Sequence, residues 1–173
     1  MSNNKINDRN PNFLSPINFK FKLSRAPNLN FFIQKITVPD LTLPDVSMSN
    51  PLITYPFPGD HLTYGDLTMT FKVDENLQNY MEVQNWMRGL GKPSGAEYAA
   101  LAAQPSYLGM GLRSDISLTI LTSNKNPNYE IVFKDAFPTQ LSGMEFLTTA
   151  TDVDYLEASA TFKYLIYDIT KII

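Results

Sequence analysis

Apolar and polar residues alternate along several short segments of this chain, and such alternation is typical of strands that bury one face. In the clearest segment, residues 66–74, Leu67, Met69, Phe71 and Val73 alternate with aspartate, threonine and lysine side chains. The same alternation predicts strands over 17–23, 115–121, 129–135 and 156–169. Because Pro, Gly and Asn separate these short segments, they predict antiparallel sheets with tight connections.

Turn-forming residues between the segments predict two hairpins. The sequence SRAPNLN leads from the first strand to a second one over 30–38, and SNKNPN joins the strands 115–121 and 129–135. Residues 136–148 are predicted to form a further strand with a bulge at Gly143. The last strand is predicted to place these side chains on one face: Ala158, Ala160, Phe162, Tyr164 and Ile166.

One helix is predicted over residues 75–90, directly after the clearest strand. Asp74 is a favourable N-cap, and Gly89 or Gly91 can end the helix in the left-handed conformation. Its apolar side chains recur at helical spacing and form one broad stripe: Leu77, Tyr80, Met81, Val83, Trp86, Met87 and Leu90. Because an isolated helix of this length is marginal in water, we expect the stripe to pack on the sheets.

A proline-rich segment, residues 39–61, interrupts the strands. Its five prolines exclude a central strand, since proline cannot donate to the hydrogen-bond ladder. The segment predicts a long extended excursion in the form of a two-stranded arm. Its apolar side chains would be costly in water, so we expect four of them to contact neighbouring subunits: Leu52, Ile53, Tyr55 and Phe57.

These elements predict a mainly β fold, a sandwich or partial barrel of antiparallel strands with one flanking helix. Residues 17–173 are expected to form a single domain, preceded by a polar N-terminal arm over 1–16. Residues 92–114 are interpreted as a loop containing a possible helix over 96–103. Short alternating strands leave sheet edges, and edges that are not protected favour pairing with another copy of the chain.

Composition gives little support to catalysis. Without cysteine, the chain has no thiolate nucleophile and no Cys-ligated metal. His61 is the one histidine, and a surface role is favoured over a general base because no partner is evident. Asp152 and Asp154 lie two apart, which is more typical of a solvated turn than of a calcium loop. GMGLRS lacks the lysine of a phosphate-binding loop. We therefore expect a protein that is not an enzyme and has no cofactor.

The net charge of −3 gives no long-range reason to bind nucleic acid. The N-terminus has no apolar stretch typical of a signal peptide, and no segment approaches the ~20 apolar residues needed to span a bilayer. We expect a soluble protein made inside a cell. Two hypotheses of different classes stay open: a self-assembling structural subunit, and a monomeric carbohydrate-binding sandwich that stacks sugars on Tyr98, Tyr107 and Tyr129.

The order of these elements resembles a known family. The chain runs through FKFKLSRAPNLNFFIQKITVPDLTLP, then PFPGDHLTYGDLTMTFKVDE, then NWMRGLGKP, and closes with ATFKYLIYDI. This order is similar to that of the tail tube proteins of contractile-tailed phages of the T4-like type. The resemblance covers roughly residues 17–168 and is strongest over 55–91.

The resemblance implies a structural virion protein that forms hexameric rings, stacked into a tube through which DNA is ejected. The fold is shared by tube-initiator and hub proteins of the baseplate, by tail terminators, and by the haemolysin-coregulated proteins of type VI secretion. It implies sheath, tape measure and baseplate proteins as partners, no membrane, and assembly in the host cytoplasm. We expect Lys20, Lys22 and Lys163 to be offset by acidic neighbours or to lie outside the bore, since a positive lumen would grip DNA.

Overall fold

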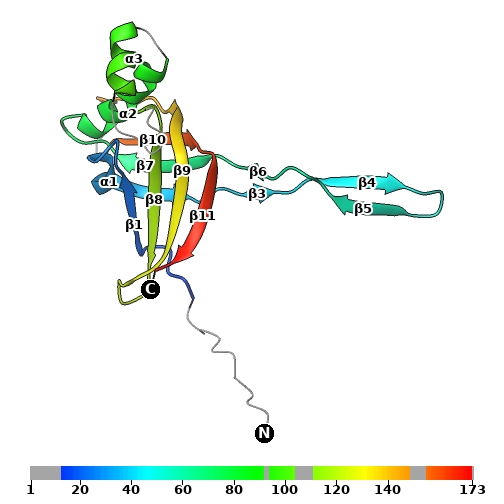
Figure 1. Ribbon diagram of the computed structural model, residues 1–173. Coiled ribbons are helices and arrows are strands. Elements are labelled where there is room, and N and C mark those ends of the chain that lie inside the picture. Colours follow the sequence, from blue (N-terminus) through cyan, green and yellow to red (C-terminus); the bar gives the residue numbers. More distant parts are fainter. Residues whose placement is uncertain (1–12, 92–93, 104–110, 149–154, 173) are drawn as a thin grey trace.

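The computed structural model describes residues 13–91, 94–103, 111–148 and 155–172. A body of strands and helices carries a long arm that projects to one side (Figure 1). The helices are α1 (Leu29–Phe32), α2 (Gln78–Leu90) and α3 (Gly95–Ala102). The strands of the body are β1 (Phe19–Leu23), β2 (Ile33–Thr37), β7 (Leu67–Lys72), β8 (Ser114–Leu121), β9 (Pro127–Leu141), β10 (Glu157–Lys163) and β11 (Ile166–Lys171). The arm holds β3 (Leu41–Thr42), β4 (Asp45–Ser49), β5 (Thr54–Pro58) and β6 (Thr63–Tyr64).

The body is one seven-stranded antiparallel sheet in the order β1-β8-β9-β10-β7-β2, with β11 also paired to β9. Strand β9 links two halves of this sheet. Its first part pairs with β8 and β11, and its last part pairs with β10. The mainly β fold expected from the sequence is confirmed.

A bulge bends β9 at Asp135. Two residues of β9 lie opposite Asp115 of β8, because Ser114 pairs with Ala136 whereas Ile116 pairs with Phe133. Asp135 has a φ of 55°, which is rare for a residue other than glycine. The carboxylate of Asp115 accepts a hydrogen bond from the Asp135 N–H at 3.0 Å and so stabilises the bend. The predicted bulge at Gly143 is wrong, because β9 runs unbroken to Leu141 and ends before this glycine.

The alternating segments form the core as predicted. Leu67, Met69 and Phe71 of β7 are fully buried, and β10 contributes the buried Ala158, Ala160 and Phe162. In the register, Phe71 lies opposite Ala158 and Met69 opposite Ala160, so large and small side chains alternate across the strands. Helix α2 covers this face with Val83 and Trp86. The Trp86 ring lies 6.0 Å from that of Phe162, and its indole N–H donates to the Leu112 carbonyl at 2.9 Å.

Helix α2 begins later than predicted and is held by a different residue. Leu77 precedes it with a φ of 57°, and Asp74 does not cap it. The buried side chain of Asn79 accepts a hydrogen bond from the Asp74 N–H at 3.2 Å and donates to the Lys72 carbonyl at 2.8 Å. Asn79 therefore joins the start of the helix to the end of β7. The predicted left-handed end is also wrong, since Gly91 has a φ of −71°.

The predicted hairpin between the first two strands does not form. Helix α1 occupies the start of the segment predicted as a strand over 30–38, and β2 pairs with β7 while β1 pairs with β8. Asn30 of α1 explains the separation: its side chain accepts from the Leu23 N–H at 2.8 Å and donates to the Leu23 carbonyl at 3.4 Å. The hairpin of β8 and β9 is confirmed.

Two further boundaries differ from the sequence prediction. The last strand is interrupted at residues 164–165 into β10 and β11, which follow β9 one after the other. The segment 92–114 holds α3, which confirms the possible helix there. This helix is present in addition to the one flanking helix that the sequence predicted.

We predict that Asn79→Ala lowers the free energy of unfolding by about 1–3 kcal/mol, because it leaves two main-chain groups without partners. Chemical denaturation of the purified protein measures this loss. Gln78→Ala is the matched control, since Gln78 is the exposed neighbour at the same helix start. An Asn79→Ala protein as stable as this control would contradict the assigned role.

Candidate assembly surfaces

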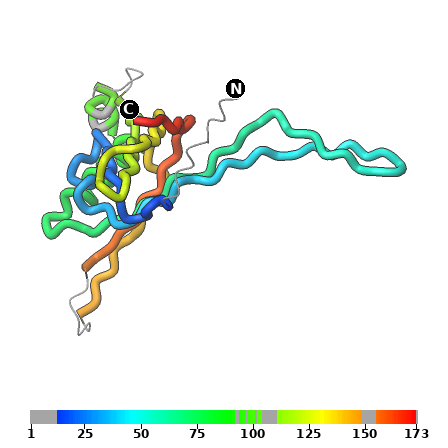
Figure 2. Tube along the Cα trace, turned by 90° about the horizontal axis from the view of Figure 1, so that it is seen from below, coloured from blue at the N-terminus to red at the C-terminus, as the bar shows by residue number. Residues whose placement is uncertain are grey.

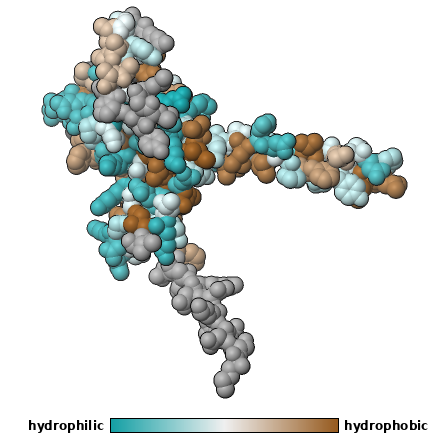
Figure 3. Space-filling model, viewed as in Figure 1, coloured by the Kyte–Doolittle hydropathy of each residue, from teal (hydrophilic) through white to brown (hydrophobic). Residues whose placement is uncertain are grey.

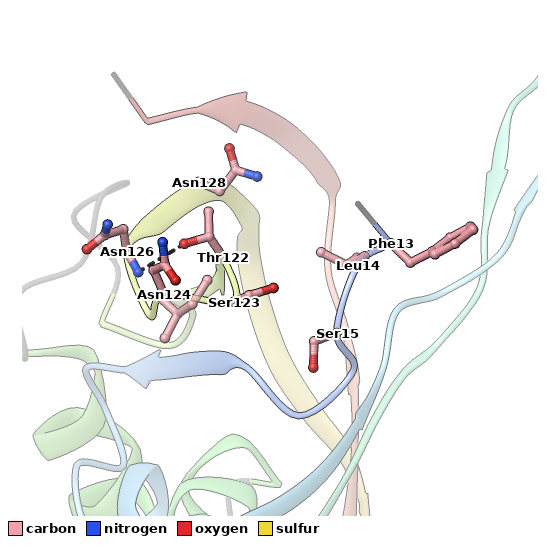
Figure 4. A pocket seen from close by; sticks show the side chains of 9 residues that line it. Phe13, Leu14, Ser15, Thr122, Ser123, Asn124, Asn126 and Asn128 are labelled. Carbon is pink, nitrogen blue, oxygen red and sulfur yellow. Dashed lines mark hydrogen bonds between the residues drawn. The ribbon is translucent and has the colours of Figure 1, made fainter. Parts of the chain in front are cut away.

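The hollow nearest the N-terminal segment carries no catalytic group. It has a volume of about 440 Å³ and lies between residues 13–15 and the turn that joins β8 to β9. Figure 4 shows Phe13 pointing away from the turn, whose wall is formed by hydroxyl and asparagine side chains. Thr122 Oγ1 accepts from the Asn126 N–H at 3.2 Å, which only stabilises the turn.

The other residues considered for catalysis or metal binding do not form a site within the described part of the chain. His61 is exposed in the segment between β5 and β6. Within the described ranges, no three His, Asp or Glu side chains gather into a metal-binding group. The pair Asp152 and Asp154 lies outside the described residues. None of the described helices is long and apolar enough to cross a membrane.

The arm is a two-stranded ribbon with one apolar face. Two short sheets follow one another along it, first β3 with β6 and then β4 with β5. Figure 2 shows that the arm extends well clear of the body. Val46 lies opposite Phe57 and Met48 opposite Tyr55, so four large side chains share one face. Aspartate, serine, threonine and proline occupy the other face, and all residues of β4 and β5 are exposed.

The tip of the arm is also apolar. Asn50 and Ile53 exchange two main-chain hydrogen bonds of 3.0 and 3.2 Å, which close the turn. Leu52, at the turn, is 93% exposed. Apolar patches therefore follow the arm from base to tip (Figure 3).

Close main-chain contacts hold the two sides of the arm together near its base. The Gly59 N–H donates to the Pro44 carbonyl at 2.7 Å, and a Cβ at Gly59 would lie 2.7 Å from the same oxygen. The Gly65 N–H donates to the Asp40 carbonyl at 3.0 Å, and a Cβ there would collide with the Asp40 side chain. At Gly59 a larger residue would require a shift of the Pro44 backbone, whereas at Gly65 a rotation of the Asp40 side chain would make room.

Aromatic rings anchor the arm to the body. Tyr64 of β6 contacts Tyr164 and Tyr167 edge-on at 5.9 and 5.6 Å, and both of these rings contact Phe133 of β9. The hydroxyl of Tyr164 is buried and has no hydrogen-bond partner among the described residues. Burial raises the pKa of Tyr164 to about 12, and the neighbouring Tyr167 and Tyr64 add to the rise.

Three of the described strands of the body have an open edge. Within the described residues, β1 pairs with β8 alone, β11 with β9 alone and β2 with β7 alone. The main-chain groups of Leu23 point to the open side, where Asn30 binds them. By alternation, the N–H and C=O groups of Phe19 and Phe21 point to the same side. The Ile172 N–H donates to the Asn128 carbonyl of β9 at 2.9 Å, so Ile169 and Lys171 present theirs on the opposite, open side.

An apolar groove runs along the open edge of β1, between this strand and β2. It has a volume of about 630 Å³. Ile17, Phe19 and Phe21 form one wall, and Phe31 and Ile33 form the other. Ile17 is 81% and Phe31 86% exposed, which is unusual for large apolar side chains and is typical of a surface that another chain covers.

The sheet of β1, β8, β9 and β11 has an outer face, defined here as the face turned away from the core. Its charged side chains are three lysines and three carboxylates: Lys20, Lys22, Lys134, Asp115, Glu130 and Asp168. Lys134 Nζ lies 2.7 Å from Asp168 Oδ2. The outer face is therefore balanced in charge. Of the other lysines with a predicted outward position, Lys163 pairs with Asp66 at 2.9 Å and Lys72 lies over the Tyr155 ring.

The structure places all four predicted contact residues on the arm, Tyr55 and Phe57 on its apolar face and Leu52 and Ile53 at its tip. Sequence reasoning missed that Val46 and Met48 complete this face, although their spacing of two was a usable signal. It expected open sheet edges but did not assign them to β1 and β11, because no local signal identifies an edge strand.

The tyrosines proposed to stack sugars do not form a platform. Tyr98 lies on α3, at the end of the body opposite to the first residues of β9, which include Tyr129 (Figure 1). Tyr107 lies outside the described residues. A flat aromatic surface therefore has no support from the two tyrosines that the structure describes.

Comparison with known proteins gives a consistent result. The family model described as phage tail tube protein matches residues 12–170. A curated relative, the tail tube terminator protein of Enterobacteria phage T4, is 28% identical over 149 residues, which are 80% of this chain and 76% of the relative.

Solved structures show the same fold at low sequence identity. The tube-terminating cap of the anti-feeding prophage is 13% identical with a TM-score of 0.63, over 99% of this chain and 100% of that one. A chain of the sheath–tube complex of an extracellular contractile injection system is 12% identical with a TM-score of 0.61, over 94% of both chains.

We predict that Tyr164→Phe leaves the free energy of unfolding unchanged or raises it, because the lost hydroxyl has no partner. The folded-state pKa of about 12 exceeds the ordinary value of 10.0, so ionisation of Tyr164 favours the unfolded chain. Stability is therefore lost as the pH rises above 10.0. When thermal unfolding is measured as the pH rises above 10.0, the loss of stability should be smaller for Tyr164→Phe than for the control Tyr129→Phe, which keeps the Tyr164 hydroxyl. Equal losses would contradict the assignment.

Proposed function

Because this chain belongs to the phage tail tube protein family, we propose that copies of it close into a ring that forms part of the tail tube of a contractile-tailed phage. As a family member it is a structural component of the virion tail. The observation that supports a ring is the pair of open edges on one sheet, β1 on one side and β11 on the other.

The order and directions of the strands allow the sheets of successive copies to join into a closed ring. The strands β1, β8, β9 and β11 alternate in direction, so β11 runs antiparallel to the β1 of a next copy in the same orientation. Repetition of this step continues one antiparallel sheet through every copy, and closure of the ring removes the open edges of β1 and β11. Six copies are the number expected from the resemblance to phage tail tubes.

The arm is proposed to contact a neighbouring subunit. Full burial of a large apolar side chain contributes about 1.5–3 kcal/mol, and the apolar face holds four such side chains, each about half exposed. Burial of this face against another copy would contribute several kcal/mol. Leu52 and Ile53 at the tip extend the same contact.

The position of the ring along the tail is proposed from the relatives. The curated T4 relative is a tail tube terminator, and one similar structure is a tube-terminating cap. We propose that this ring ends the tube. A subunit of the tube body is the second candidate, favoured by the similar chain in a sheath–tube complex.

A conduit for DNA fits the balanced outer face. If this face lines the bore, its three lysines are matched by three carboxylates, so phosphates would find no net attraction. DNA would then pass without specific binding. Besides further copies of the chain, the proposed partners are sheath, tape measure and baseplate proteins.

We predict that the purified protein forms closed rings that do not grow into long tubes, as seen by negative-stain electron microscopy. Long tubes would favour the tube-body candidate instead. A compact monomer at high concentration, measured by sedimentation, would contradict ring assembly and revive the monomeric binding module.

We also predict that the double variant Tyr55→Ser, Phe57→Ser raises the concentration needed for assembly by about tenfold or more, because it removes half of the apolar face. Mass photometry over a dilution series measures this concentration. Ser47→Ala, Ser49→Ala is the control on the polar face of the same ribbon. Both variants should unfold like the unaltered monomer, since these side chains are exposed. Unchanged assembly of the Tyr55 and Phe57 variant would remove the arm from the interface.

A further inference from the structure

We propose that Asp168 on the open edge of β11 forms a cross-strand ion pair with Lys22 or Lys20 on the β1 edge of the next copy, and that this pair fixes which edges join and limits the junction to these two registers. The inference rests on the proposed ring. It concerns the chemistry of the junction between copies, which ring closure alone leaves undefined.

Main-chain geometry restricts the possible registers. On β1, the groups of Phe19 and Phe21 face the open side, and on β11 those of Tyr167, Ile169 and Lys171 do so. Hydrogen-bonded pairs between the two edges must therefore combine these residues with one another. The residues between them, Lys20 and Lys22 on one strand and Asp168 on the other, then lie on the same face of the joined sheet.

Residues that lie opposite one another across β1, β8, β9 and β11 form a row, and one such row has a lysine at the β1 edge and an aspartate at the β11 edge. Lys22 lies opposite Ser117, Ser117 opposite Val132, and Val132 opposite Asp168. Continuation of this row into the next copy sets Asp168 directly against Lys22. A shift of two residues, as the shear of a closed barrel requires, sets it against Lys20 instead. In both registers the second lysine lies one diagonal step away, within reach of a long side chain.

Asp168 can accept this additional partner. Its Oδ2 atom lies 2.7 Å from Lys134 Nζ of the same chain, and both side chains are 47% exposed. A carboxylate offers acceptor sites on both oxygens, so a lysine of the next copy can bind beside Lys134. Coverage by the neighbour would reduce solvent screening and strengthen the attraction.

The same charges oppose wrong assemblies. Two β1 edges brought together would place Lys20 and Lys22 of both copies on one face, and two β11 edges would bring the Asp168 carboxylates together. Like charges directly across a sheet are destabilising. The head-to-tail junction of β11 with β1 is the combination that pairs opposite charges, which favours a ring over a closed dimer.

Apolar contact supports the junction on the other face. Ile169 follows Asp168, points to the core-facing side and is 57% exposed at the open edge. In the joined sheet it would lie beside Phe19 and Phe21, over the groove that Phe31 lines. The ion pair thus selects which edges join, while the apolar contact contributes most of the affinity.

Charge reversal tests the proposal with the full-length protein. The double variant Lys20→Glu, Lys22→Glu and, separately, the single variant Asp168→Lys should each raise the concentration for ring assembly by about tenfold, because each places like charges at every junction. Lys125→Glu is the control, since Lys125 is an exposed lysine in the turn between the inner strands β8 and β9, away from both edges. Thermal unfolding of dilute samples verifies that the variant chains fold.

An equimolar mixture of the two charge-reversal variants gives the decisive result. The β1 and β11 edges are both acidic in the double variant, and both are basic in the Asp168→Lys variant. In a ring in which the two variants alternate, every junction therefore again joins an anion to a cation. Native mass spectrometry should show mixed rings with equal numbers of both variants, at a concentration where neither variant assembles alone.

The outcomes separate the two proposals. Rings of the unaltered protein together with unaffected variants, or with a mixture that fails to assemble, would overturn the ion pair and leave the ring standing. Absence of rings from the unaltered protein would overturn both.

Discussion

Main-chain hydrogen-bonding groups on the open edges of β1 and β11 are the constraint on which the rest of this structure depends. Asn30 binds both groups of Leu23 and so ends the open stretch of β1 just after Phe21. Monomeric proteins protect such edges with charge, proline or a covering segment. Here the edge of β1 borders an apolar groove instead. Lys20 and Lys22 lie on this edge strand, and the carboxylate of Asp168 lies on β11 at the opposite edge of the same sheet. These features support the proposal that another copy of the chain continues the sheet.

Strand β9 connects the sheet with the open edges to the base of the arm, the two surfaces that are proposed to contact other copies. Its bend at Asp135, stabilised by Asp115, lets one strand belong both to the sheet with the open edges and to the half covered by α2. Phe133, just before the bend, contacts the tyrosines that hold the base of the arm. The arm and the edges are therefore parts of one packed unit, which allows contacts around the ring and contacts through the arm to form together.

The sequence predicted features that depend on local periodicity. Alternation around Phe71 located a core strand, and the prolines of residues 39–61 identified the arm, because proline excludes a central strand wherever it occurs. Pairing could not be predicted, since it depends on distant partners. The separation of β1 from β2 follows from the side chain of Asn30, and the start of α2 follows from Asn79. Open edges were expected from the short strands, but the sequence does not identify β1 and β11 as the edge strands, because an unpaired strand alternates like a paired one.

Amide hydrogen exchange of the assembled protein, compared with the dilute monomer, tests the central claim most directly. The account predicts slower exchange in the assembly for the amides of Phe19 and Phe21 on β1 and of Ile169 on β11. The amide of Leu23 should change least, because Asn30 already binds it. Equal exchange of the edge amides in both states would contradict the claim that the two edges join.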